Sequence, residues 1–339
     1  MFSPDGEHKK LYQRKPLFAF DETQDFETQK QRLRAKLREL LGDEPQKVDP
    51  APALTLLKET ETYTDYRLVF QAEAEVQAVC RFLLPKTDAK KIPLTICLQG
   101  HSTGMHISLG EEKYPGDKDD GDRNIAMQAI SRGYAALCVE QRGMGERRSD
   151  ALWDPARTDD GRPRCRFTAM NALLLGRTLI GERCFDISRA LDVALELFPQ
   201  LDAEKIICTG NSGGGTATYY ASCMDERIAV SMPSCAVCTY KDSIGAMYHC
   251  DCNYIPGSAK YFDMGDLALL IAPRKLIVIN GREDPIFPEP GVIETYETIK
   301  KIYHAAGAPD HCALVTGDGG HRYYKAPAWA AFDKMDALR

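Results

Sequence analysis

The sequence predicts an α/β fold, a mostly parallel central sheet with helices on both faces, preceded by an N-terminal helical extension. Short apolar runs typical of buried strands recur along the chain, and helical patterns separate several of them. The chain has 339 residues, of which 44% are hydrophobic and 27% charged, as in a packed globular protein. Strands that alternate with helices pair in parallel, because each helix returns the chain to the same edge of the sheet.

Two regions precede the alternating part. Residues 26–41 place apolar side chains at helical spacing and stop at Gly42, which predicts a helix within an extension covering residues 1–60. Between residues 61 and 84, two apolar runs, TYTDYRLVFQ and EVQAVCRFLLP, predict an antiparallel pair of strands. This pair would extend one edge of the sheet, and residues 61–339 would form the main domain.

The alternating part begins at residue 92. Its predicted strands cover residues 92–98, 134–140, 205–210, 228–233, 275–280 and 312–317, and its predicted helices cover 123–132, 182–198, 213–224, 291–304 and 327–338. Residues 143–181 interrupt the pattern after the fourth strand with a segment rich in Arg, Asp and Gly that holds Trp153. Such an insertion predicts a lid or an oligomer contact, so a homo-oligomer is an open expectation.

The overall charge and the N-terminus exclude several classes of partner. A formal charge of -6 and a pI near 5.7 leave no basic surplus for a phosphate backbone, so we expect no nucleic-acid partner. Residues 1–10 are polar and no apolar stretch of about 18 residues follows, so we expect neither a leader nor a membrane partner. The expected location is cytoplasmic.

The chain contains 12 cysteines. Several of them, such as Cys80 and Cys138, fall inside apolar strand-like runs and are expected to be reduced core thiols. The pairs Cys235-x-x-Cys238 and Cys250-x-Cys252, with His249 adjacent, raise the question of zinc. Since the second pair is too closely spaced for a usual zinc knuckle, we expect core or loop thiols and no metal site.

A serine lies at the turn between a predicted strand and a predicted helix. Gly210-x-Ser212-x-Gly214 directly follows the strand KIICTG and precedes the helix-compatible TATYYASCM. This context is typical of a nucleophilic serine, which such a turn holds in a strained conformation above the sheet and near a helix N-terminus. The alternative is a glycine-rich turn with an unreactive serine.

A serine needs a base to take its proton, and the base needs a carboxylate to orient it. Asp284 follows the predicted strand KLIVIN, and His321 follows the predicted strand CALVTG. Both therefore lie at the strand ends where open α/β sheets bind ligands. Glu283 and Asp318 are competing acids.

An acyl-transfer site also needs two donors for an oxyanion. We expect the amide of Gly213, which follows the serine, and the amide of His101, with Ser102 next in preference, in the loop after the strand IPLTICL. Gln99, Arg142 and Asn211 are expected to shape the substrate pocket.

Over residues 60–335 the chain resembles the α/β-hydrolase superfamily, and within it the dienelactone-hydrolase-related group that includes acetyl xylan esterases and cephalosporin C deacetylases. The motifs that carry the resemblance are Gln99-Gly100-His101, Gln141-Arg142-Gly143-x-Gly145, Gly210-Asn211-Ser212-Gly213-Gly214, Leu270-Ile271-Ala272-Pro273-Arg274, Asn280-Gly281-x-x-Asp284 and Gly320-His321. Family members often have His-Gly at Gln99-Gly100 and a glutamine at Gly213. The resemblance implies an α/β-hydrolase fold and makes residues 61–339 the catalytic domain.

The resulting hypothesis is a serine esterase that cleaves a carboxylic ester with a small acyl group through an acyl-enzyme intermediate, without a cofactor. The expected partner is a small-molecule ester such as an acetylated sugar. Two alternatives stay open, a serine peptidase of the prolyl-oligopeptidase type and a non-catalytic binding protein with the same fold. About 60 leading residues are too few for the large propeller domain that such peptidases usually carry.

Overall fold

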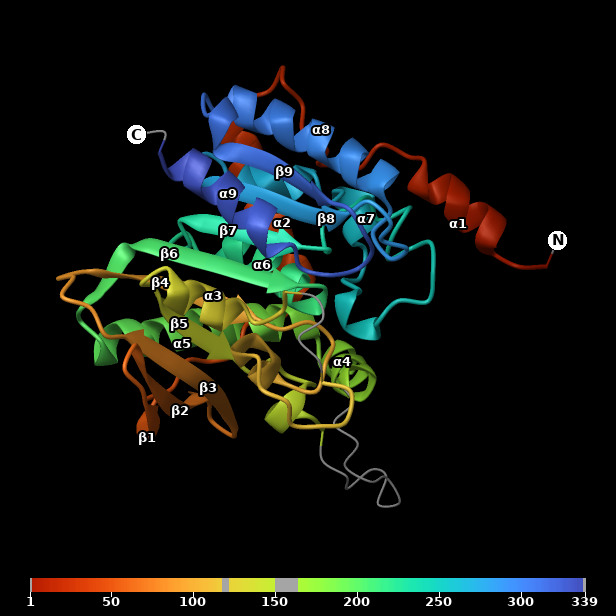
Figure 1. The fold of residues 1–339 in the computed structure, drawn as a ribbon. Helices are drawn as coiled ribbons and strands as arrows, with labels where there is room; N and C mark the ends of the chain where they lie inside the picture. The colour runs from red at the N-terminus through yellow and green to blue at the C-terminus, as the bar shows by residue number, and fades with distance from the viewer. Residues whose placement is uncertain (1, 118–121, 150–163, 338–339) are drawn as a thin grey trace.

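The computed structural model describes residues 2–117, 122–149 and 164–337, which form a sheet with helices on both faces (Figure 1). The sheet has nine strands in the order β1-β2-β3-β5-β4-β6-β7-β8-β9. Their bounds are β1 Ala53–Glu59, β2 Tyr63–Glu73, β3 Val76–Pro85, β4 Ile92–Leu98, β5 Ala135–Val139, β6 Leu201–Asn211, β7 Val230–Ser234, β8 Lys275–Gly281 and β9 Cys312–Gly317.

The pairing divides the sheet into two parts. β1, β2, β3 and β5 pair antiparallel in that order, whereas β5, β4, β6, β7, β8 and β9 pair in parallel. The predicted α/β fold with a mostly parallel sheet and an antiparallel lead-in is therefore confirmed. Because the last six strands run in one direction, the loops after β4, β6, β7, β8 and β9 all leave from the same edge.

The helices cover both faces of this sheet (Figure 1). Their bounds are α1 Asp5–Tyr12, α2 Phe26–Leu41, α3 Ile125–Ser131, α4 Cys165–Leu174, α5 Leu179–Leu197, α6 Gly213–Met224, α7 Ser258–Tyr261, α8 Glu289–Ala305 and α9 Lys325–Asp336. One core contains apolar side chains of α2, α5, α6 and α8, and the other contains those of α3 and α9. Alternate residues of β4 serve the two cores, since Ile96 belongs to the first and Cys97 to the second.

The N-terminal helix predicted at residues 26–41 is α2. Asp25 caps its first turn by accepting a hydrogen bond from the Thr28 amide at 2.8 Å, and Gly42 follows its last residue. Leu33 and Leu37 are 1% and 0% exposed and belong to the main core. The extension therefore packs against the sheet, while its boundary at residue 60 stays a prediction.

The sequence-based prediction lacks α1, α4, α7 and β1, and two of these, α1 and β1, bury no residue. α1 buries none of its residues, so it shows no apolar face, and the prediction treated that segment as a polar tail. β1 is an edge strand whose seven residues are all exposed, so it lacks the alternation that marks a half-buried strand. Both elements form without the apolar burial on which a sequence-based assignment depends.

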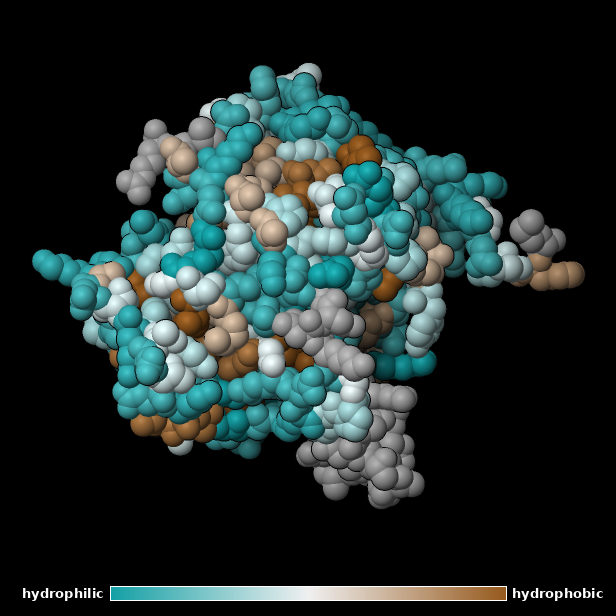
Figure 2. All heavy atoms as spheres, viewed as in Figure 1, coloured by the Kyte–Doolittle hydropathy of each residue, from teal (hydrophilic) through white to brown (hydrophobic). Residues whose placement is uncertain are grey.

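The face shown in Figure 2 is predominantly hydrophilic, with scattered apolar side chains. Within the described residues, no helix combines the length and apolar character needed to cross a membrane. Of the predicted insertion at 143–181, residues 150–163, including Trp153, lie outside the described residues. Its role as a lid or oligomer contact therefore stays a prediction.

Candidate active site

Ser212 occupies a strained turn between β6 and α6. Its φ is 56° and its ψ is -122°, a conformation that non-glycine residues rarely adopt. The turn also brings α6 so close to β4 that a Cβ on Gly214 would lie 2.1 Å from the carbonyl oxygen of Leu98. Glycine at position 214 is therefore a steric requirement of the serine turn.

Backbone hydrogen bonds fix this turn from both sides. The Ser212 amide donates to the Ser234 carbonyl at 2.8 Å, and the Ser212 carbonyl accepts from the Thr216 amide at 2.8 Å. The first bond ties the turn to the end of β7 and the second opens α6. Ser212 is left partly exposed, with its side chain at the carboxyl edge of the sheet.

Asp284 and His321 are joined by a hydrogen bond. His321 Nδ1 lies 2.7 Å from Asp284 Oδ2, and Asp284 Oδ1 accepts from the amides of Ile286 and Phe287 at 2.8 and 3.2 Å. Burial alone would raise the pKa of Asp284, but the hydrogen bond and charge of His321 and the two amides outweigh it and lower the pKa. Asp284 is thus an ionised carboxylate that orients the imidazole.

The loops that carry these two residues are tied to each other. The amide of Arg282 donates to the Gly317 carbonyl at 2.9 Å, and the amide of Glu283 donates to the Gly319 carbonyl at 2.8 Å. The ring of Phe287 also stacks on the His321 imidazole, with centroids 6.0 Å apart and planes 16° apart. The imidazole is therefore held by its nitrogen and by one face.

The competing acids of the sequence-based prediction lie elsewhere. Glu283 is exposed and contributes only its backbone to the loop. The Asp318 side chain is 91% exposed and pairs with Arg282 at 3.5 Å. Of these three carboxylates, only Asp284 is hydrogen-bonded to the imidazole of His321.

A cavity of about 420 Å³ brings the serine and the histidine together. It is lined by Gly100, His101, Ser102, Arg123, Asn211, Ser212, Gly320, His321 and Arg322. Three loops from the carboxyl edge of the sheet, those after β4, β6 and β9, supply most of this lining. Asn211 is therefore placed at the cavity as expected from the sequence, and its Oδ1 accepts a hydrogen bond from Ser234 Oγ at 3.0 Å.

Gly213 and His101, the two residues predicted to donate to an oxyanion, lie next to Ser212 in sequence and in the lining of the same cavity, respectively. Gly213 is the first residue of α6, where backbone amides have no acceptor within the helix and the helix dipole favours negative charge. The His101 imidazole packs against Gly213, since a Cβ there would lie 2.6 Å from His101 Cε1. This contact explains why a glycine stands where the resemblance leads one to expect glutamine.

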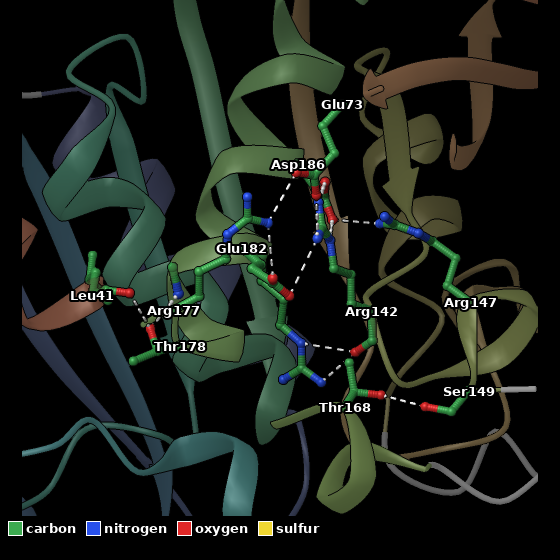
Figure 3. Close-up of polar contacts among 12 residues, drawn as sticks. Leu41, Glu73, Arg142, Arg147, Ser149, Thr168, Arg177, Thr178, Glu182 and Asp186 are labelled. Carbon is green, nitrogen blue, oxygen red and sulfur yellow. Dashed lines mark hydrogen bonds and ion pairs between the residues drawn. The ribbon is translucent and has the colours of Figure 1, made fainter. Parts of the chain in front are cut away.

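Arg142 does not shape the cavity wall, which corrects the expectation from the sequence. It is 7% exposed and pairs with Asp186 and Glu73, each at 2.8 Å, and with Glu182 at 3.3 Å (Figure 3). Arg147 also reaches Asp186, at 2.6 Å. A buried charge needs a partner, and Asp186 of α5 supplies one to both arginines. This buried ion-pair network therefore connects the loop after β5 to α5.

Gln99 also lies beneath the cavity and not on its lining. It is 2% exposed, and its Nε2 donates to Glu140 Oε1 at 2.6 Å. Glu140 accepts from the Met105 amide at 3.0 Å as well, so it holds the loop that carries His101. Burial raises the pKa of Glu140 to about 7.

Sequence reasoning did not assign Arg123, Arg322 or Cys235 to this site, and it treated Cys235 as a core or loop thiol. The two arginines line the cavity and give it a cationic wall, although Arg322 also pairs with Asp122 at 3.4 Å. The Cys235 thiol lies close to Asp284 and His321. Burial raises its pKa to about 12, so it is a neutral thiol at pH 7. Its position at the end of β7 was the one available signal, since strand ends gather at this edge.

A model of the Abhydrolase family matches residues 5–330. The chain belongs to the Abhydrolase family. A curated relative of this family member is the Bacillus subtilis (strain 168) protein named "Putative hydrolase YtaP", which is 25% identical over 296 residues, covering 85% of this chain and 92% of that protein.

Solved structures share the fold. A protein described as "a putative acetyl xylan esterase (BF1801)" from Bacteroides fragilis NCTC 9343 has a TM-score of 0.78 at 18% identity, covering 94% of this chain and 83% of that chain. A glucuronoyl esterase from Solibacter usitatus has a TM-score of 0.69 at 15% identity, covering 96% and 97%. At these identities the likeness concerns the fold of this Abhydrolase family member.

Proposed function

We propose that this chain is a serine esterase that cleaves a carboxylic ester with a small acyl group through an acyl-enzyme intermediate. The observation that carries the proposal is the 2.7 Å hydrogen bond between Asp284 and His321, in a cavity that His321 shares with the strained Ser212. A nucleophile, a base and an orienting carboxylate in chain order are the parts that acyl transfer to water requires.

In the acylation step His321 takes the proton of the Ser212 hydroxyl as the oxygen attacks the ester carbonyl. The amides of Gly213 and His101 donate to the oxyanion that forms, and one such donor typically contributes about 10²- to 10³-fold in rate. Asp284 stabilises the charged imidazole. The intermediate then collapses, its bond to the alcohol breaks, and His321 gives its proton to the leaving alkoxide.

In the deacylation step water attacks the acyl-enzyme. His321 takes a proton from that water, the same amides bind the second oxyanion, and collapse releases the carboxylic acid and restores the Ser212 hydroxyl. As the acyl bond to Ser212 breaks, His321 returns its proton to the serine oxygen, so the protons move among Ser212, His321, the leaving alcohol and water.

The cavity and the comparisons support a small polar ester as substrate. About 420 Å³ is near the lower end of ligand pockets, and nearly all of the lining is glycine or polar side chains. An acetylated sugar fits this description, and the solved structures that share the fold include acetyl xylan esterases and glucuronoyl esterases. The arginines at 123 and 322 favour a substrate rich in acceptor oxygens.

The test is hydrolysis of a nitrophenyl acetate by the wild type and by Ser212→Ala. We expect the variant to lose at least about 10⁴-fold in kcat with an unchanged circular dichroism spectrum, because no other group can form the acyl-enzyme. A fluorophosphonate should label the wild type at Ser212. Ser131→Ala, which removes a hydroxyl that bonds only the Gln128 carbonyl at 2.8 Å, is the matched control.

Two results would contradict the proposal. Wild-type turnover in Ser212→Ala would show that the serine is not the nucleophile, and failure of both labelling and hydrolysis in the wild type would favour a non-catalytic binding protein. A preference for an aminoacyl amide over an acetyl ester would instead point to the peptidase alternative.

A further inference from the structure

One imidazole and three thiols form a compact group beside the catalytic cavity. The nitrogen of His101 and the sulfurs of Cys165, Cys250 and Cys252 all lie within 4.8 Å of one another. His101 Nε2 is 3.0 Å from Cys252 Sγ, and the sulfurs of Cys252 and Cys250 are 3.2 Å apart. We call these four residues the thiol–imidazole cluster.

The thiol–imidazole cluster joins three separate parts of the chain. His101 comes from the loop after β4, Cys165 is the first residue of α4, and Cys250 and Cys252 lie at the 3₁₀ turn Asp251–Asn253. Cys165 and Cys252 are 2% and 1% exposed and belong to a small core of their own with Met144, Ala169 and Leu179. The four possible ligand atoms thus converge from three separate segments.

A buried arginine faces the sulfurs. Arg183 of α5 is 1% exposed, and its Nη1 lies 3.4 Å from Cys252 Sγ and its Nη2 3.3 Å from Cys165 Sγ. Its remaining hydrogen bonds go to the Arg142 carbonyl, at 2.8 and 3.2 Å. In the described part of the chain no carboxylate pairs with it, in contrast to its neighbour Arg142.

This arrangement has a consequence for the charge of the thiols. A buried guanidinium without a counter-charge is strongly unfavourable, and the two sulfurs that Arg183 contacts are the groups placed to supply one. Three thiolates beside one guanidinium would leave a net negative charge in a closed space. A divalent cation among the thiolates cancels the remainder, because three thiolates, one such cation and one guanidinium are neutral together.

We propose that His101, Cys165, Cys250 and Cys252 bind a zinc ion. Three thiolates and one imidazole are a common ligand set of structural zinc, and four protein ligands leave no position for substrate. Around tetrahedral zinc neighbouring sulfurs lie about 3.8 Å apart and a sulfur and nitrogen about 3.6 Å apart. The His101–Cys252 and Cys250–Cys252 pairs would each separate by about 0.6 Å to reach these distances.

The site goes beyond the proposed esterase activity and replaces the expectation of no metal. That expectation considered Cys235-x-x-Cys238 and Cys250-x-Cys252 with the adjacent His249, whereas the structure brings His101 and Cys165 from distant segments to Cys250 and Cys252. Zinc would anchor the imidazole of His101, and with it the loop that presents the His101 amide to the oxyanion. Its role is structural, and it takes no part in the transfer of protons or acyl groups.

The test measures zinc in the full-length protein, purified reduced and without a histidine tag. We expect about one zinc per chain by elemental mass spectrometry, and loss of at least tenfold in zinc occupancy in Cys252→Ser and in Cys165→Ser. Cys312→Ser is the matched control, since Cys312 is also a free cysteine and lies outside the cluster. Ser212→Ala should retain zinc, so a failure of the esterase proposal is distinguishable from a failure of this one.

A second measurement does not depend on the variants folding. Cobalt(II) added to the zinc-free wild-type protein should give the visible absorption of a tetrahedral thiolate site, and thiol modification should release stoichiometric zinc. Absence of zinc both after purification and after addition of zinc to the reduced protein would overturn the proposal. So would a disulfide between Cys250 and Cys252 in the freshly isolated protein, or unchanged zinc in a folded Cys252→Ser variant.

Discussion

The cavity around Ser212 and the cluster around Arg183 share one residue, His101, but they differ in how far their polar groups are exposed and in what those groups contact. In the cavity, the His321 side chain is 21% exposed and only its Nδ1 is bound to a carboxylate, so the other nitrogen is available for proton transfer. In the cluster, Cys165 and Cys252 are almost fully enclosed, and the sulfurs contact one another and Arg183. One region leaves an imidazole partly exposed at a cavity, and the other encloses the thiols of Cys165 and Cys252.

The difference shows how each region can be recognised. A group that reacts with substrate needs an open side, so it lies at a cavity and is positioned by a partner behind it. A metal ligand has to be deprotonated and held in a fixed orientation by the groups around it, so it is surrounded by side chains. His101 belongs to both regions, since it lines the cavity and its imidazole lies in the cluster.

The largest expected effect should come from a substitution that changes the cavity and leaves the cluster intact. Asp284→Asn should lower kcat for an acetyl ester about 10⁴-fold, because the asparagine favours the wrong imidazole tautomer and cannot stabilise the imidazolium. Zinc content should not change, because Asp284 is not in the cluster. The control is Glu283→Gln, which alters an exposed neighbouring carboxylate. Equal losses of kcat in both variants would contradict the role given to Asp284.

A smaller effect should come from the point where the two regions meet. Gly213→Ala would place a Cβ 2.6 Å from His101 Cε1 and 2.7 Å from His101 Nδ1, so the ring has to move. We expect kcat to fall about 10- to 10³-fold through the displaced oxyanion donor, and zinc affinity to fall with it. Kinetics and zinc titration of the same sample measure both.

A double-mutant cycle sharpens this prediction. Once His101→Ala has removed the ring, the added methyl of Gly213→Ala meets nothing there, so the second substitution should have little further effect. Fully additive losses would show that position 213 acts independently of His101 and that the two regions are not coupled through it.

The smallest expected effect concerns the stability of the loop that serves both regions. Since burial raises the pKa of Glu140 to about 7, the folded protein binds a proton that the unfolded chain releases near pH 4. This contribution to the free energy of unfolding is complete below about pH 4 and is lost as the pH rises through about 7. The shift corresponds to at most about 3 kcal/mol.

Urea denaturation at pH 5 and pH 7.5 tests this prediction on the wild type and on Glu140→Gln. The wild type should lose stability relative to Glu140→Gln between pH 5 and pH 7.5, because the glutamate releases its proton in this range and the glutamine has no proton to lose. A pH-independent difference would show that Glu140 does not titrate in this range.

Much of the arrangement around Ser212 could be predicted from the sequence because its signals are local. Ser212, Asp284 and His321 each follow an apolar strand and lie in a glycine-containing turn, and parallel strands bring their carboxyl ends to one edge. Arg142 shows the limit of the same reasoning. It also follows a strand, but the carboxylates of α5 and β2 that neutralise it are distant in sequence, so its burial was not visible.

The sequence by itself determined the α/β architecture, the strand ends that carry the reactive side chains and the glycine turn around Ser212. These depend on apolar periodicity and on the backbone conformations that single residues allow. Only the tertiary structure decided that α1 and β1 form, that His101 packs on Gly213, and that His101, Cys165, Cys250 and Cys252 meet beside Arg183. Such contacts join residues far apart in the chain, and their energy comes from burial and charge pairing that exist only after the segments have packed together.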